Sequence, residues 1–181
     1  LSGRAYHTAI WAEWGTGDNE KGVIIWGGVN GLTYYNSGAI YRPVTNTWLA
    51  MPVSGFASAR ARHSAVWTGT QMIIWGGSNL STSLNTGAKY NPATNAWVAA
   101  TDTSDPDTPS MRYSHLSVWT GTVMVIWGGL GGSGGGRYEP ISNTWQSMSQ
   151  TSQPPSRATP AIWTGTEMLV WGNSDGWIGG R

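Results

Sequence analysis

Short apolar runs, each closed by turn residues, recur along the chain. Three of them read "GVIIWGG", "QMIIWGG" and "VMVIWGG" and end at Gly28, Gly77 and Gly129, and a fourth, "EMLVWGN", ends at Asn173. An unbroken apolar run of this length is typical of a strand that is buried on both faces. The glycine pair that follows ends the strand and lets the chain turn away. The pattern therefore predicts one buried strand in each run.

The residues around the second run complete a unit of four short antiparallel strands. The segment "TGT" at 68–70 predicts a turn in which Gly69 supplies a positive φ. The segment "NPATN" at 91–95 predicts a second turn, because proline fixes φ and asparagine tolerates left-handed geometry. The strands are expected at residues 63–67, 72–75, 87–90 and 96–100.

The same unit returns at a spacing of about 50 residues, so the repeat is the main organising feature of the chain. Each copy begins with Arg-x-x-His, continues through the Trp-Gly-Gly run and ends with Tyr-x-Pro-x-Thr/Ser-Asn-x-Trp. The fourth copy, which begins at Ser156, lacks the arginine and the histidine. The repeated positions are Arg4, His7, Trp26, Arg60, His63, Trp75, Arg112, His115, Trp127 and Trp171. We expect repeat units at 4–59, 60–111, 112–155 and 156–181, in one segment that spans 1–181.

These residues resemble the kelch repeat, which carries an arginine and a small residue or histidine at its start, a glycine pair after an apolar strand, and a Tyr-x-Pro turn followed by Trp. The resemblance covers nearly the whole chain and implies an all-β, kelch-type β-propeller in a Trp-rich, bacterial variant. It places the strand after Arg-x-x-His innermost and the strands that carry Trp48, Trp97 or Trp145 outermost. The residue between Tyr and Pro, often Asp in kelch repeats, is Arg42, Asn91 or Glu139 here.

The fourth unit is shorter than the others, so we expect about three and a half blades and an incomplete ring. Propellers usually close with about four to eight blades. Three explanations are open: the remainder of a longer propeller completes the ring, a second copy covers the open edge, or the chain forms a small self-sufficient propeller.

Composition narrows the class of partner. Only 10% of residues are charged, against about 25% in an average protein. The net charge is +1 and no Lys/Arg cluster is present, which argues against nucleic acid and anionic membranes. No apolar run reaches the roughly 20 residues of a membrane span. The abundance of Ser, Thr, Gly, Asn and Trp, with little Lys, favours an extracellular or cell-surface bacterial protein.

Few residues suggest chemistry. The absence of cysteine excludes disulfides, thiolate metal sites and cysteine nucleophiles. The repeated arginines and histidines are interpreted as structural, with anion recognition and a metal or catalytic cluster as the alternatives. Asp102, Asp105 and Asp107 are weak candidates for calcium ligands in what we interpret as a solvated loop. We expect no cofactor.

The loops after each glycine pair differ most between units, and variable loops on a rigid frame often carry recognition. They hold aromatic rings beside amide and carboxylate groups, a mixture that suits either a glycan or a protein surface. The candidate ligand-binding residues are Asn30, Tyr34, Tyr35, Asn36, Asn79, Asn85, Asp175 and Trp177.

The sequence therefore predicts a non-enzymatic recognition or scaffold module that binds a protein or a glycan through these loops. One alternative is a propeller segment of a larger secreted enzyme, galactose-oxidase-like or otherwise carbohydrate-active. Galactose-oxidase-type copper sites use a Cys-linked Tyr, and this segment lacks cysteine, so catalysis would lie outside these residues. Another alternative is a structural subunit whose copies join through open blade edges.

Overall fold

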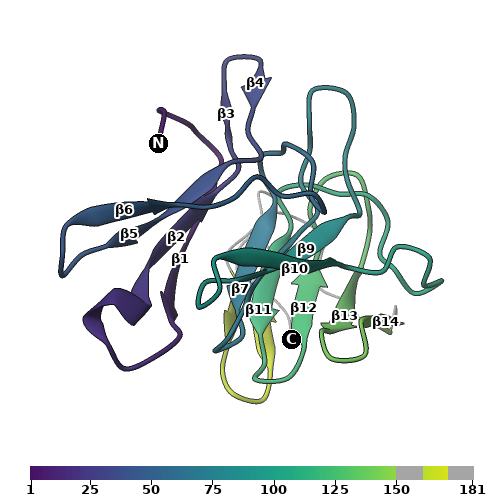
Figure 1. Ribbon diagram of the computed structural model, residues 1–181. Helices are drawn as coiled ribbons and strands as arrows, with labels where there is room; N and C mark the ends of the chain where they lie inside the picture. The colour runs from purple at the N-terminus through teal and green to yellow at the C-terminus, as the bar shows by residue number, and fades with distance from the viewer. Residues whose placement is uncertain (150–160, 171–181) are drawn as a thin grey trace.

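Three four-stranded antiparallel sheets make up most of the computed structural model, which describes residues 1–149 and 161–170 (Figure 1). The first sheet has the order β1-β2-β5-β6, formed by Thr8–Glu13, Lys21–Trp26, Gly38–Arg42 and Thr47–Ala50. The second has the order β7-β8-β9-β10, formed by Ser64–Trp67, Met72–Trp75, Gly87–Asn91 and Ala96–Ala100. The third has the order β11-β12-β13-β14, formed by Leu116–Trp119, Met124–Trp127, Gly135–Glu139 and Thr144–Ser147. The predicted all-β class is confirmed.

Smaller elements accompany these sheets. A fourth unit contributes the pair β15 (Ala161–Trp163) and β16 (Met168–Val170), and the hairpin of β3 (Val29–Asn30) and β4 (Thr33–Tyr34) extends from the first sheet. The 3₁₀ turn η1 (Asp18–Glu20) lies between β1 and β2. Among the described residues this turn is the sole helical segment, and it is far too short to cross a membrane.

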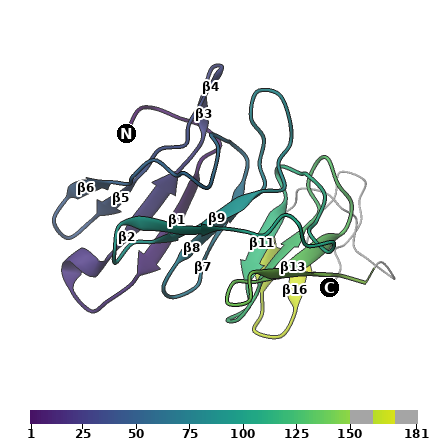
Figure 2. The ribbon, with the colours of Figure 1, turned by 45° about the vertical axis from the view of Figure 1, so that its right-hand side comes forward.

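The sheets stack side by side as blades, and we refer to them as blades 1, 2 and 3 (Figure 2). The first strands β1, β7, β11 and β15 lie next to one another in that order. The outermost strands are β6, β10 and β14. This is the inner and outer order that the kelch resemblance implied, and within the described residues the blades form an open arc rather than a closed ring.

Burial of the second strands shows how the blades protect one another. All four residues of β8 and of β12 are buried, as the unbroken apolar runs predicted. In β2 burial alternates along the strand, so only every second residue is fully covered. Blades 2 and 3 have a blade on each side, whereas blade 1 has a described neighbour on one side only. A blade therefore hides its second strand completely only when it is flanked on both faces.

The turns follow from the residues that the sequence supplies. Gly69 has φ +97° in the Thr-Gly-Thr turn between β7 and β8. Asn46, Asn95 and Asn143 have φ of 51°, 49° and 60° in the turns before β6, β10 and β14. In these turns the asparagine side chain accepts a hydrogen bond from the tyrosine of the preceding strand, as from Tyr90 at 2.6 Å. The predicted roles of glycine and asparagine in the turns are confirmed.

Tryptophan rings fill the joints between blades. Trp97 of β10 packs edge-on against Trp26 of blade 1, with ring centroids 5.4 Å apart. Trp145 of β14 makes the corresponding contact with Trp75 of blade 2 at 5.2 Å. Each pair belongs to an apolar cluster that spans two blades. Burying aromatic side chains of this size stabilises the stack by roughly 2–3 kcal/mol or more for each ring.

Candidate binding face

The two ends of the blades differ in what they present. The loops after each glycine pair, with the Arg-x-x-His segments, lie at one end, which we call the loop face (top of Figure 1). The turns between the first and second strands lie at the opposite end, which we call the turn face. The residues predicted to bind a ligand belong to the loop face.

An arginine fixes the base of each loop. Arg60 is fully buried, and its guanidinium donates to the carbonyl oxygens of Gly76 at 2.9 Å and Thr86 at 2.6 Å, one at each end of the loop in blade 2. It also donates to the hydroxyl of Thr86 and to the carbonyl of Ser58. Burial lowers the pKa of Arg60 to about 10. The loop is therefore closed at its base by one side chain.

Blades 1 and 3 repeat this arrangement with different degrees of burial. Arg112 is 1% exposed and donates to the carbonyls of Gly128, Gly134 and Ser133. Arg4 is half-buried and donates to the carbonyls of Gly27 and Ser37. Burial lowers the pKa of Arg112 as well. Within the described part of the chain none of these guanidinium groups pairs with a carboxylate, so carbonyl and hydroxyl oxygens balance the charges.

A histidine locks each blade to the one before it. In the joint between blades 1 and 2, His63 Nε2 lies 2.9 Å from the hydroxyl of Thr8, and its ring packs edge-on against Trp26 at 5.2 Å. A Cβ at Gly27 would lie 2.6 Å from His63 Cε1, so the first glycine of the pair leaves room for the ring. Burial, with smaller contributions from nearby Arg60 and the other histidines, lowers the pKa of His63 well below its usual value. The imidazole is therefore neutral.

The joint between blades 2 and 3 has the same construction. His115 Nε2 lies 2.8 Å from the hydroxyl of Ser64, and a Cβ at Gly76 would lie 2.5 Å from His115 Cε1. Burial, followed by the charge of Arg112, lowers the pKa of His115 to about 3. His7 occupies the same place in blade 1 and is exposed. Over residues 1–149 and 161–170, no group of three His, Cys, Asp or Glu side chains could hold a metal ion.

Backbone hydrogen bonds link the blades along the inner rim of the loop face. Arg62 donates its N–H to the carbonyl of Tyr6, and Ser114 donates to the carbonyl of Arg62, both at 2.9 Å. All three residues have positive φ, between 53° and 57°, which is uncommon for side chains other than glycine and asparagine. The contacts on both sides hold this conformation in place.

The side chain of Arg62 lies between two aromatic rings on this rim. Its guanidinium carbon is 4.4 Å from the ring centroid of Tyr6 and 5.7 Å from that of Tyr113. Arg62 is exposed, and it makes no side-chain hydrogen bond or ion pair with the described residues. The sequence did not identify this residue, because it stands at the variable position before the repeated histidine. The one feature of the sequence that could have pointed to Arg62 is the second arginine in the segment "RARH" at 60–63.

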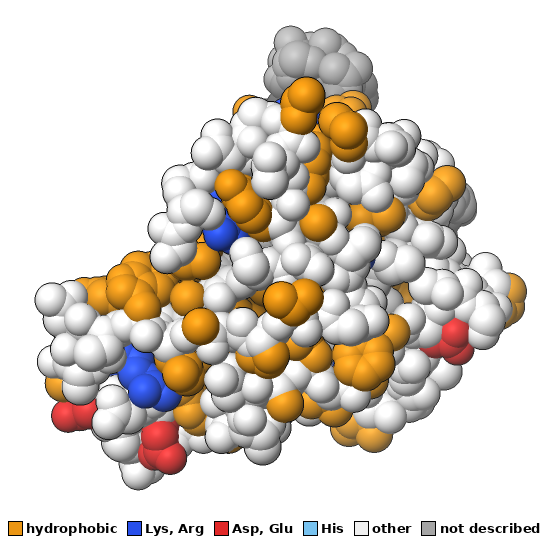
Figure 3. Space-filling view, turned by 45° about the horizontal axis from the view of Figure 1, so that its top comes forward, with side chains coloured by type: hydrophobic (Ala, Val, Ile, Leu, Met, Phe, Trp, Pro, Cys, Tyr) orange, Lys and Arg blue, Asp and Glu red, His pale blue; other side chains and the backbone are white. Residues whose placement is uncertain are grey.

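Three exposed leucines lie on the loop face. Leu32 and Leu80 stand at loop tips, whereas Leu130 stands at the base of its loop, where its backbone pairs with Tyr113. Leu32, Leu80 and Leu130 come from blades 1, 2 and 3 and are 79%, 65% and 55% exposed. Tyr6 and Met111 are also large apolar residues exposed at this end of the molecule. Figure 3 shows hydrophobic side chains spread over the face that is tilted toward the viewer, with few charged groups. The loop face therefore displays apolar groups on a frame that the arginines hold fixed.

The predicted ligand-binding residues occupy varied positions on this face. Asn30 is exposed in the β3–β4 hairpin, and Tyr34 of the same hairpin is half-buried. One face of the Tyr35 ring is covered by Arg4, whose guanidinium carbon lies 4.2 Å from the ring centroid. Asn79 accepts hydrogen bonds from the N–H groups of Ser81 and Thr82 and so stabilises its own turn.

The remaining candidates are Asn36 and Asn85, which are half-buried in their loops. Asp175 and Trp177, together with the repeat position Trp171, lie outside the described residues. Their proposed roles stay predictions.

The carboxylates of the acidic segment around Asp105 accept hydrogen bonds from backbone N–H groups. Asp105 Oδ2 accepts the N–H of Trp145 at 2.7 Å, which ties the segment to β14. Asp102 accepts hydrogen bonds from the backbone and hydroxyl of Ser104, and those bonds lower the pKa of its carboxyl. Asp107 donates its N–H to Asp105 Oδ1. The three carboxylates do not form a group that could bind a metal ion in the part of the chain described.

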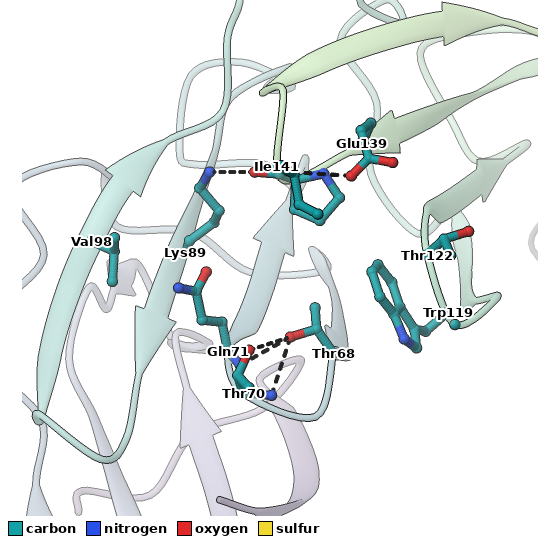
Figure 4. Close-up of a pocket in the computed structure, with 11 residues that line it drawn as sticks. Thr68, Thr70, Gln71, Lys89, Val98, Trp119, Thr122, Glu139 and Ile141 are labelled. Carbon is teal, nitrogen blue, oxygen red and sulfur yellow. Dashed lines mark hydrogen bonds between the residues drawn. The ribbon is translucent and has the colours of Figure 1, made fainter.

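A cavity of about 470 Å³ opens on the turn face, between blades 2 and 3 (Figure 4). Residues from five separate stretches of the chain line it, and none of them is among the residues predicted to bind a ligand or a metal ion. Sequence reasoning missed the site because its walls meet only when the two blades are in contact.

Comparison with known families gives one match. The model described as the KLHDC2/KLHL20/DRC7 Kelch-repeats domain matches residues 6–178. Among curated proteins, none matches this sequence. The family match spans all three complete blades and agrees with the arrangement of the strands.

Proposed function

The chain belongs to the kelch-repeat domains of the KLHDC2/KLHL20/DRC7 type, and from this premise we propose that it recognises a protein partner through its loop face. Kelch-repeat domains generally act as protein-binding scaffolds. We assign the contact with the partner to the loop face.

The exposed leucines in the loops of three consecutive blades carry the proposal. Isolated apolar side chains are common on protein surfaces, but here each of the three loops presents one exposed leucine on the same face. Apolar groups that are exposed together on one face are typical of interaction sites. Such side chains become buried anchors when a partner covers them.

The aromatic residues of the loops favour a protein over a glycan on this face. A sugar ring needs an open aromatic face on which to stack. Arg4 covers one face of Tyr35, whereas the leucines are open. Leucine offers no planar surface for a sugar, but it packs well into a pocket on a protein.

Arg62 adds a polar anchor to the same surface. Its guanidinium is held between Tyr6 and Tyr113 and has no carboxylate partner among the described residues. A carboxylate or a carbonyl group of a partner would supply the missing acceptor. Because two rings already orient the group, little conformational entropy is lost when that bond forms.

Site-specific photo-crosslinking tests the proposal. A photoreactive phenylalanine derivative replaces Leu80 at the loop face or Val44 at the opposite end of blade 1, where Val44 is also exposed. Cells that express each version are irradiated, and the crosslinked proteins are identified by mass spectrometry. We expect a protein that crosslinks at position 80 and not at position 44.

A series of variants then measures how much the leucines contribute to the affinity for the crosslinked protein. Replacing Leu32, Leu80 and Leu130 together by Ser should weaken binding of the purified partner by roughly 100-fold or more, as for a set of anchor residues. The matched change Val44→Ser should leave the affinity unaltered. Equal binding by the triple variant and the parent protein would rule out the loop face.

We further propose that this recognition takes place outside the cell or at its surface, on the support of the low lysine content and the abundance of Ser, Thr, Gly, Asn and Trp. Fractionation of the source cells with an antibody against the chain tests the location.

A further inference from the structure

We propose that the cavity on the turn face, between blades 2 and 3, is a second binding site and that it takes a neutral saccharide. The inference is independent of the protein-binding role proposed for the loop face, because the two surfaces lie at opposite ends of the blades (Figures 1 and 4). The cavity volume of about 470 Å³ lies within the range of roughly 300–1,000 Å³ that is typical of small-molecule sites.

Trp119 forms one wall of the cavity. It ends β11, it is half-buried, and its indole ring stands across the opening from Val98 and Lys89 (Figure 4). The ring packs against the apolar cluster of blades 2 and 3 and has no aromatic partner among the described residues. An aromatic ring that borders a cavity in this way suits the apolar C–H face of a sugar ring.

Polar groups with unused hydrogen-bonding capacity surround this wall. The side-chain amide of Gln71 and the indole N–H of Trp119 make no hydrogen bond with the described residues. Glu139 uses one oxygen, Oε1, to accept the N–H of Ile141. Lys89 Nζ uses one of its three donors on the carbonyl of Pro140 at 2.9 Å. The lining therefore offers both donors and acceptors, which sugar hydroxyl groups can use.

The charges favour a neutral ligand. One ammonium group and one carboxylate line the cavity, so neither an anion nor a cation meets a surface of uniform opposite sign. The other polar lining groups are the amide of Gln71 and the hydroxyls of Thr68, Thr70 and Thr122.

The shape of β10 argues against an extended peptide as the occupant. A peptide commonly binds by adding a strand to a sheet edge. The pairing of β10 with β9 shifts register between Trp97 and Ala99, so Val98 stands in a bulge at the side of the cavity. A bulge bends the edge strand and interrupts the regular row of backbone groups that an added strand would use.

The joint between blades 1 and 2 lacks the same polar groups, although it is built from the same repeat. The position of Lys89 in blade 1 is Ile40, which is fully buried, and the position of Glu139 in blade 2 is Asn91. The position of Gln71 is Gly22 in blade 1 and Val123 in blade 3. The polar lining is therefore particular to one joint, and repetition of the blade does not account for it.

Titration with defined sugars tests the inference. The panel contains the methyl glycosides of glucose, galactose, mannose and N-acetylglucosamine and their disaccharides, with galacturonate and glucosamine as charged comparators. Saturation-transfer NMR on the full chain detects contact, and the dissociation constants follow from titration. We expect saturable binding of at least one neutral sugar at millimolar concentration, and weaker binding of both charged sugars.

Two variants locate the binding. Gln71→Val introduces the residue that blade 3 has at this position, so the turn should fold normally, and the affinity should fall by about five- to tenfold through loss of a polar contact. Trp119→Leu removes the aromatic wall and should abolish the saturation transfer. The matched change Trp67→Leu, at the same repeat position in blade 2, controls for lost packing and should leave binding intact.

Three outcomes would overturn the proposal. One is the absence of saturable binding by every neutral sugar in the panel. Another is an affinity that neither Gln71→Val nor Trp119→Leu changes. The third is tighter binding of a charged sugar than of its neutral counterpart.

Discussion

Blades 1 and 3 carry the same residues at the same repeat positions, yet these residues have opposite surroundings. Trp145 of blade 3 is 2% exposed, whereas Trp48 of blade 1 is 52% exposed. His115 is buried against Trp75 and Ser64, whereas His7 is exposed. The repeat motif around each residue is the same, so the difference in burial comes from the neighbouring blade.

This comparison shows where the stability of the molecule resides. The outer tryptophan and the histidine of a blade contribute fully to stability only when the preceding blade covers them. Strand propensity and turn chemistry build each sheet, and the contact between sheets supplies most of the apolar burial. The same substitution should therefore have different effects in blades 1 and 3.

The largest expected difference is between Trp145→Ala and Trp48→Ala. Removal of the Trp145 ring empties the joint beside Trp75, and we expect a loss of about 3–5 kcal/mol in the free energy of unfolding. The Trp48 ring is half in solvent and contacts Tyr41 of its own blade, so its removal should cost about 1 kcal/mol. Urea unfolding followed by far-UV circular dichroism measures both. Equal losses would mean that the joint does not dominate the stability.

A smaller difference is expected between Arg112→Lys and Arg4→Lys. Lysine retains the charge but cannot hold the fork of contacts that Arg112 makes with Gly128, Gly134 and Ser133. The loss of these charge-assisted bonds in a buried site should cost about 2–3 kcal/mol. Arg4 is half-exposed, and water can replace its partners, so its change should cost under about 1 kcal/mol. Thermal unfolding of the two variants, side by side with the parent chain, gives the comparison.

For a drop of one pH unit, the smallest expected difference concerns acid. The pKa of His115 in the fold is lowered to about 3, below the value of about 6.5 in the unfolded chain, so the unfolded state binds more protons between these two values. The contribution of neutral His115 is fully present above about pH 6.5 and is lost as the pH falls towards 3. This single group should reduce the free energy of unfolding by up to about 1.4 kcal/mol for each pH unit in that window.

Two glutamine variants isolate this term. His115→Gln keeps a polar group near Ser64 but cannot be protonated, and it should reduce the dependence of stability on pH between about 6 and 4, while the contribution of buried His63 remains. His7→Gln, at the exposed equivalent position, is the matched variant for the chemical change itself. Urea titrations at several pH values measure the slope, and an unchanged slope in His115→Gln would contradict the assignment.

The sequence predicted the blade well, because the signals for its strands and turns are local. The run ending in Trp75, the glycine at 69 and the asparagine at 95 each act through their own backbone geometry, and each behaves as expected. The kelch resemblance supplied the order of the strands. Comparison of several copies of the repeat also separates the motif residues from residues that vary in a single copy.

The contacts between blades could not be predicted in the same way. The sequence explained the glycine pair as a point where the chain swings away, whereas Gly76 also leaves room for His115 of the next blade. That contact joins residues far apart in the chain, and no local sequence pattern predicts it. The turn-face cavity escaped notice for the same reason, since Gln71 and Trp119 approach each other only across a joint.

The hydrogen bonds along the inner rim have a consequence for how this molecule can diversify. Main-chain hydrogen bonds link Tyr6, Arg62 and Ser114, so this link between blades does not require a particular side chain at each position, although the Arg62 guanidinium also packs on Tyr6. Three chemically unrelated side chains already occupy equivalent places on it. Mutation can therefore exchange these groups while the scaffold beneath them stays the same, and a new specificity can arise at the rim without a new architecture.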